Sequence, residues 1–250
     1  MNRHLSMRTA NPALQSDTFR KSMSASTAST GVMTINGVVN KTGLALLILI
    51  ISASVTWSNP ELAGLAVIGL ISGIIAAIAT IFKPTIANIT VPIYAISQGL
   101  VLGALSRVFE MQYPGIAVQA IFLTFGTLGS LLLAYMSGLI RATENFKLGV
   151  FAATGAIAVV YLINFVMSFF GSGMGIMQID NASPMSIGFS VIVVIIAALN
   201  LVLDFDFIEE GAEKGAPKYM EWYGAFGLLV TLIWLYLEIL RLLAKLNSRR

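Results

Sequence analysis

Long apolar stretches without a charged residue dominate the chain and predict helices that cross a membrane. Charged residues divide the chain into seven such stretches, most of which approach the roughly 20 residues that a helix needs to span the bilayer core. A charge near the bilayer centre costs on the order of 3 kcal/mol, so each span is expected to lie between charges. The pattern predicts spans at residues 42–58, 62–82, 86–108, 115–139, 147–170, 185–207 and 219–245.

The last predicted span carries charges near its C-terminal end. Its charge-free part is short, and Glu238, Arg241 and Lys245 extend it in a strongly apolar setting. Long side chains near a helix end can reach the membrane interface while their stems stay in apolar surroundings. We therefore expect these three residues to belong to the seventh helix, with their charged groups at the interface.

The first 40 residues differ in composition from the rest of the chain. Residues 22–30 read SMSASTAST, which offers little apolar bulk to bury. No apolar segment follows the basic N-terminus before Thr42, so we expect a tail ahead of a first anchor rather than a cleaved signal peptide. The sequence thus predicts an all-α polytopic membrane protein, with a flexible N-terminal tail over 1–40 and a seven-helix transmembrane domain over 41–250.

The composition excludes several classes of function. With 57% hydrophobic residues, 11% charged residues and a mean hydropathy of +0.85, the chain is unlike a soluble enzyme. It has no cysteine and a single histidine, His4, which excludes disulfides, thiolate metal sites and multi-histidine zinc sites. Its basic residues are dispersed and its net charge is +3, so there is no footprint for nucleic acid. We expect no enzymatic activity and no cofactor, which leaves carboxylates to carry the chemistry.

Basic residues near the span ends predict the orientation in the membrane. If the N-terminus is cytoplasmic, ten Lys and Arg residues lie on the cytoplasmic side and five on the other. Cytoplasmic loops of membrane proteins carry an excess of Lys and Arg. The sequence therefore predicts a cytoplasmic N-terminus and, after seven spans, an external C-terminus.

Acidic and amide side chains near the end of the sixth span are the first candidates for chemistry. Asn200 and Asp204 are four residues apart and share one helix face, whereas Asp206 lies about 200° around the helix from Asp204. Asp204 is either an interfacial carboxylate that marks the helix end or a titratable gate that faces the bundle interior. Burial disfavours the charged form of a carboxylate, which would let such a gate switch near physiological pH.

Two further polar residues lie inside predicted spans. Gln98 precedes Gly99 and Gly103, whose Gly-x-x-x-Gly spacing lets another helix approach closely. Gln98 is either part of this packing or a residue of a polar pathway. Glu238 either pairs with the basic residues that follow it on the helix or works as an acid.

Short motifs occur along the chain in a characteristic order and spacing. They are NPAL at 11–14, PIYA at 92–95, GLVLGALS at 99–106, YPGI at 113–116, LDFD at 203–206, EWY at 221–223 and WLYLEILRLL at 234–243. Together with the seven spans they resemble a bacterial branch of the Bax inhibitor-1-like superfamily, the transmembrane Bax-inhibitor-motif proteins. The resemblance covers nearly the whole chain.

The resemblance implies a fold of six helices around a central seventh and a Ca²⁺ leak under pH control. In that family, an aspartate near the end of the sixth helix shares a proton with one in the seventh. Asp204 matches the first position, but the second falls near Val230 or Thr231, neither of which titrates. Either Asp206 or Glu238 substitutes for the second acid, or the gating differs.

Three functional hypotheses follow. In the first, the protein is a pH-sensitive calcium leak channel of the bacterial inner (plasma) membrane, and Asp204 also contacts the permeant Ca²⁺ because hard cations prefer oxygen ligands. The residues expected to sense pH or gate are Asp204, Asp206, Asn200, Glu238 and Gln98, the last at a position where many relatives carry Glu. In the alternative, a regulatory membrane protein binds and restrains a membrane-anchored AAA protease, with the flexible tail as the handle. A proton-coupled transporter is a third possibility.

Overall fold

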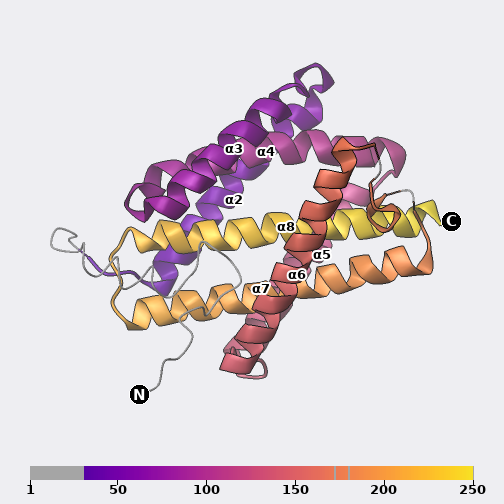
Figure 1. Cartoon of the computed structure of the whole chain (residues 1–250). Helices are drawn as coiled ribbons and strands as arrows, with labels where there is room; N and C mark the ends of the chain where they lie inside the picture. Colours follow the sequence, from indigo (N-terminus) through magenta and orange to yellow (C-terminus); the bar gives the residue numbers. More distant parts are fainter. Residues whose placement is uncertain (1–30, 172, 180, 250) are drawn as a thin grey trace. The chain divides into compact units, whose positions relative to one another are not determined.

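The computed structural model describes residues 31–171, 173–179 and 181–249, which fold almost entirely into helices. Within these residues, seven helices are long and apolar enough to cross a membrane (Figure 1). This confirms the predicted all-α, seven-span class of a multi-pass membrane protein. The helices are α2 (Ile35–Ser58), α3 (Leu65–Phe82), α4 (Ala87–Gln112), α5 (Ile116–Met136), α6 (Glu144–Phe169), α7 (Pro184–Glu213) and α8 (Met220–Ser248).

Several helices extend past the charges that bounded the predicted spans. The α2 helix begins at Ile35 rather than Thr42, because the Thr34 side chain accepts a hydrogen bond from the Gly37 amide and caps the first turn. A charge limits a membrane crossing, but it does not end a helix. The predicted tail over 1–40 therefore overlaps the first helix, and its residues 1–30 lie outside the described part of the chain.

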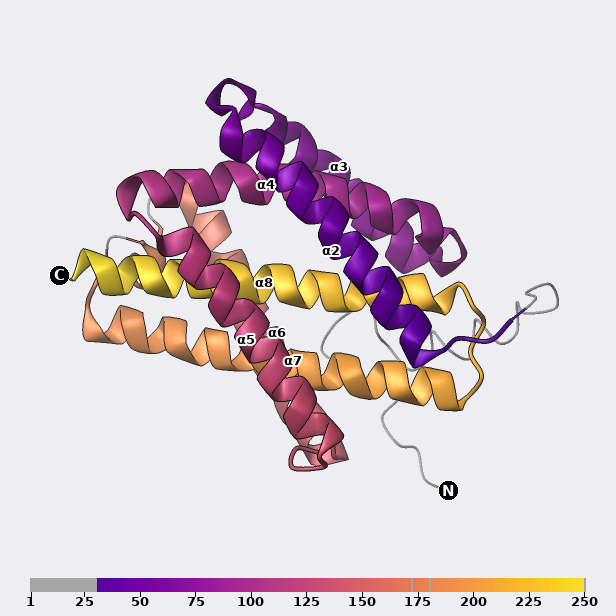
Figure 2. The same cartoon turned by 180° about the vertical axis from the view of Figure 1, so that it is seen from behind.

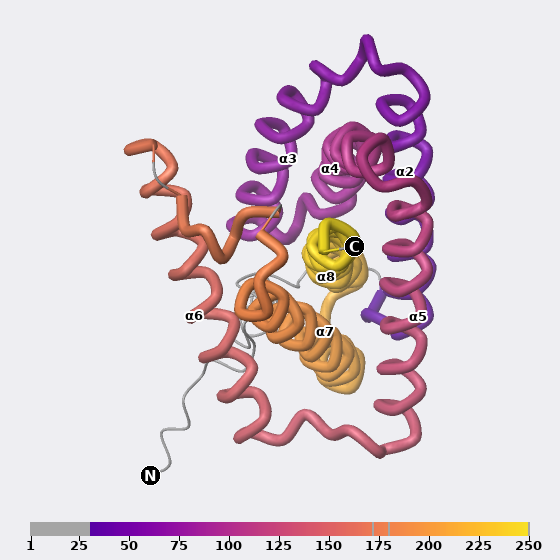
Figure 3. The backbone as a smooth tube through the Cα atoms, turned by 90° about the vertical axis from the view of Figure 1, so that its right-hand side faces the viewer, coloured from indigo at the N-terminus to yellow at the C-terminus, as the bar shows by residue number. Residues whose placement is uncertain are grey.

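The chain divides into two compact units. Unit 1 contains residues 31–108 and Asp204–Val230, and unit 2 contains Phe109–Leu203 and Thr231 onwards. The division falls inside α7 and α8, so each of these helices contributes one end to each unit. In unit 2, α5 and α6 lie on opposite sides of α7 (Figures 1, 2 and 3).

In unit 1, the glycines of α4 bring its backbone against α2, which it crosses in Figure 2. A Cβ added at Gly103 would lie 2.0 Å from the Ala53 carbonyl oxygen, and one added at Gly99 would lie 2.4 Å from that of Leu49. Only glycine permits this approach, so the predicted Gly-x-x-x-Gly contact is confirmed. It also brings the Thr56 hydroxyl within 2.9 Å of the α4 backbone, to which it donates a hydrogen bond.

The α8 helix is the most buried of the seven candidate spans. In its most apolar segment 67% of residues are buried, against 11% in that of α6. Because α8 also carries charged residues, its burial requires that these charges have partners within the protein.

The α2–α4 contact predicts a sharp difference between two glycines. Gly103→Ala should lower the free energy of unfolding by about 1–3 kcal/mol, because the new Cβ overlaps the α2 backbone. Gly126 of α5 has open space where its Cβ would lie. Gly126→Ala should be neutral or stabilising by up to about 1 kcal/mol, because it removes a helical glycine. Thermal unfolding in detergent measures both, and equal effects would contradict the close contact.

Candidate functional site

The side chain of Asp204 lies inside the protein. It belongs to the second half of α7 and is 0% exposed, and its neighbours Leu203 and Phe205 are also buried. Such burial favours the interpretation of Asp204 as an acid that faces the bundle interior over that of an interfacial carboxylate at the helix end. Asp204 is therefore an interior acid of a membrane-spanning helix, and such residues are costly and usually functional.

Asn200 lies one turn before Asp204 and links α7 to α6 in unit 2. It is buried, and its side-chain amide donates to the Thr154 hydroxyl of α6 at 2.9 Å and to the Ile196 carbonyl at 2.8 Å. Both acceptors of the Asn200 amide are neutral oxygens. Asn200 thus holds this turn of α7 against α6.

Asp206 has a different environment from Asp204. Two residues further along α7, it is half-buried rather than buried, and helix geometry puts it on another face. Glu209, one turn later, is exposed. The acidic end of α7 therefore changes from buried to exposed within a few residues.

Gln98 lies where α4 meets α3 in unit 1. A Cβ added at Gly73 of α3 would lie 2.7 Å from its side-chain nitrogen, so this glycine makes room for the amide. Beside it, the hydroxyls of Ser97 and Ser72 are hydrogen-bonded at 2.8 Å. These contacts support the packing interpretation of Gln98.

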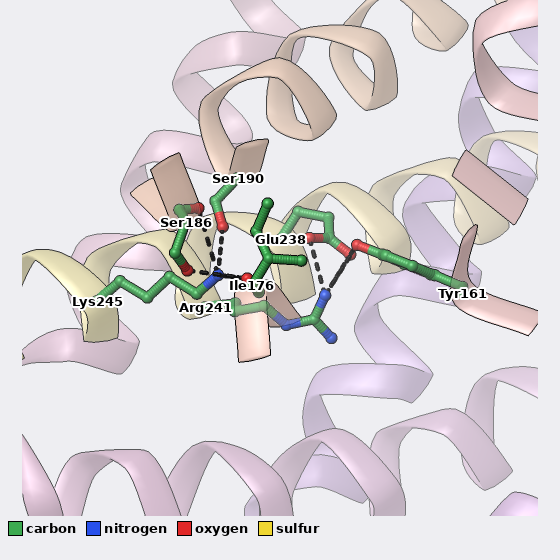
Figure 4. Close-up of polar contacts among 7 residues, drawn as sticks. All are labelled: Tyr161, Ile176, Ser186, Ser190, Glu238, Arg241 and Lys245. Carbon is green, nitrogen blue, oxygen red and sulfur yellow. Dashed lines mark hydrogen bonds and ion pairs between the residues drawn. The ribbon is translucent and has the colours of Figure 1, made fainter. Parts of the chain in front are cut away.

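Glu238 of α8 forms a closed ionic cluster with Arg241 and Tyr161, drawn in Figure 4. The Arg241 guanidinium contacts both carboxylate oxygens at 3.1 Å, and the Tyr161 hydroxyl of α6 donates to the carboxylate at 2.7 Å. Arg241 also donates to that hydroxyl at 2.8 Å. The local pairing foreseen for Glu238 is therefore present, and every member of the cluster has partners.

Among the described residues, no group of three or more His, Cys, Asp or Glu side chains could hold a metal ion. Asp204 and Glu238 fall in different units, as do Asp204 and Asn200, although the latter two share a helix. A tightly bound resident Ca²⁺ would need six to eight oxygen ligands. Asp204 alone would supply at most two of these ligands.

Comparison with known proteins identifies the family. The model of the family described as Bax inhibitor 1 like matches residues 11–248. The chain belongs to this family. No curated protein and no solved structure matches the chain. The family assignment confirms the resemblance seen in the short motifs. Two features of this Bax inhibitor 1 like protein could not be seen in those motifs.

The first of these features is a buried acid at the start of α8. Glu221 is 2% exposed and accepts hydrogen bonds from the Thr34 amide at 3.2 Å and the Lys41 ammonium at 2.9 Å. A Cβ at Gly37 would lie 2.0 Å from this carboxylate, so glycine makes room for the acid beside the first turn of α2. The EWY motif contains Glu221, but only the fold brings α2 to it.

The second is Lys245, which the sequence placed at the membrane interface. That expectation is wrong, because the side chain is 0% exposed. Its ammonium donates to the Ile176 carbonyl at 2.9 Å, the Ser190 hydroxyl at 2.9 Å and the Ser186 carbonyl at 3.4 Å (Figure 4). Three protein oxygens take the place of the interfacial water that a snorkelling lysine would reach.

The ionic cluster predicts a non-additive pair of substitutions. Arg241→Met should lower the free energy of unfolding by about 3 kcal/mol, because Glu238 stays buried without its cation. The double variant Glu238→Gln with Arg241→Met should lose less than the sum of the single variants. Thermal unfolding in detergent measures the free energy of unfolding of the wild type, the single variants and the double variant. Lys214→Met, which breaks the exposed pair with Glu210, is the control and should cost less than about 1 kcal/mol; strict additivity would disprove the coupling.

Proposed function

We propose that this Bax inhibitor 1 like protein forms a pH-sensitive calcium leak across the membrane that it spans. The observation that carries the proposal is the complete burial of Asp204 in a membrane-spanning helix. Ionisable residues in such helices are rare and mark ion pathways and proton relays. A carboxylate is also the ligand type that Ca²⁺ prefers.

Protonation of Asp204 is the proposed switch. A charged carboxylate inside an apolar segment is expensive, so the local packing of α7 depends on whether the acid is charged. The neutral form removes both the attraction for a cation and this cost. A change in pH therefore changes both the packing of α7 and the attraction of Asp204 for a cation.

We further propose that a single acid performs the switch. The α8 position at which the family resemblance implies a second aspartate holds Val230 or Thr231, and the latter is buried and cannot titrate. Glu238 is held by Arg241, and Asp206 is half-buried on another face of α7. These facts support a single titration rather than the two steps of a coupled pair.

The proposed switch predicts how flux depends on pH in two variants. Asp204→Asn mimics the protonated state permanently, so its Ca²⁺ flux in proteoliposomes should be independent of pH. Asp206→Asn is the matched control on the other face of the same helix and should keep the wild-type pH response. A wild-type profile for Asp204→Asn would show that this carboxylate does not sense pH.

The distribution of basic residues supports an orientation in a bacterial inner membrane, with the N-terminus in the cytoplasm and the C-terminus outside. Ten Lys and Arg residues then lie on the cytoplasmic side and five on the other. A reporter fused after Lys147 or after Lys218 should be cytoplasmic, and one fused after Gly173 should be external. An external signal at Lys218 would overturn the orientation.

A further inference from the structure

The Lys245 ammonium is bound by three oxygen atoms, as a cation is in a binding site. The three acceptors come from separate places in the chain: Ile176 from η4 (Gly175–Met177), and Ser186 and Ser190 from the first turns of α7. An ammonium has three N–H donors and no acceptor, so three oxygens around it satisfy the group completely. In Figure 4 these oxygens surround the end of the lysine stem.

The oxygens are themselves held in place. The Ser186 hydroxyl donates to the Ile176 carbonyl at 2.8 Å, which ties η4 to the start of α7. Both serines are buried, at 0% and 1% exposure. The site is therefore a connected set of oxygens around a buried side chain rather than a surface contact.

These three acceptors are all neutral. The nearest acid along α8, Glu238, is bonded to Arg241, and that pair leaves no net charge to oppose the lysine. A carbonyl and hydroxyl cage with no carboxylate suits a monovalent cation better than a divalent one, because Ca²⁺ sites are rich in carboxylates.

We propose that the oxygens of Ile176, Ser186 and Ser190 form a binding site for a monovalent cation of the ammonium type, and that the Lys245 ammonium is its built-in occupant. The site joins η4, α7 and α8 within unit 2. A further consequence rests on the proposed function: in a protein that conducts Ca²⁺, this fixed positive charge holds back cations at this end of α7.

The first test vacates the site and refills it. Lys245→Ala removes the side chain beyond Cβ, and the missing atoms have the size and charge of propylammonium. Propylammonium chloride should raise the melting temperature of this variant by about 4 °C, as expected for a ligand well above its dissociation constant. Tetramethylammonium, which has no N–H donor, and neutral 1-propanol should have no such effect. Wild type and Lys214→Ala, which loses an exposed lysine, should not respond.

A second variant covers the case in which Lys245→Ala does not fold. Lys245→Met keeps an apolar side chain as long as the lysine stem, so that only the ammonium group is removed. Ammonium ions should raise its melting temperature, whereas propylammonium should not, because the stem occupies the space. If neither variant shows stabilisation specific to N–H cations, the oxygens are not a cation site and the proposal is wrong.

Flux measurements separate this site from the proposed leak. In proteoliposomes, Lys245→Ala should pass Ca²⁺ roughly tenfold faster than wild type, because a repelling charge is gone, and propylammonium should remove the excess. If wild type conducts and the variant is no faster, the role of the fixed charge is overturned. If neither conducts, the leak itself is disproved, while the melting temperatures still decide whether the cation site exists.

Discussion

The structure depends on one constraint, which is that a charge inside a membrane-spanning helix must find its partners within the protein. Lipid offers neither water nor counter-ions, so each buried charge selects the segments that pack against it. Glu238 is met by Arg241 and a tyrosine of α6. Lys245 is met by oxygens of η4 and α7, and Glu221 by the start of α2. These contacts tie the ends of α8 to their neighbours in each unit.

The same constraint explains how α8 can be both charged and the most buried span. Its charges lie near its two ends, and the segment between them, which includes Leu229, Leu232 and Leu235, is apolar and buried. Hydrophobic packing in lipid gives little preference for one helix neighbour over another, because lipid is as apolar as leucine. Polar pairs and close glycine contacts such as Gly103 against α2 therefore specify which helices meet.

The sequence predicted what depends on local pattern, and it missed what depends on distant partners. The charge-free intervals located all seven helices because the cost of a buried charge acts on each segment separately. The glycine contact of α4 followed from helix periodicity. The burial of Glu221 and Lys245 could not be foreseen in this way, because Lys41 is 180 residues from Glu221 and Ile176 is 69 residues from Lys245. The protease-binding alternative concerns chiefly residues 1–30, which lie outside the described part of the chain.

The charged groups of α8 and the buried acid of α7 differ in their surroundings, and the proposed switch is based on this difference. Glu238 is bonded to Arg241 of α8 and to Tyr161 of α6, so this cluster holds α6 and α8 together in unit 2. Asp204 of α7 lies between the buried apolar residues Leu203 and Phe205. At the position where the resemblance implies a second family acid, the chain holds Val230 or Thr231. We therefore propose that protonation of Asp204, rather than of an acid held in an ionic cluster, is the step that alters the packing of α7.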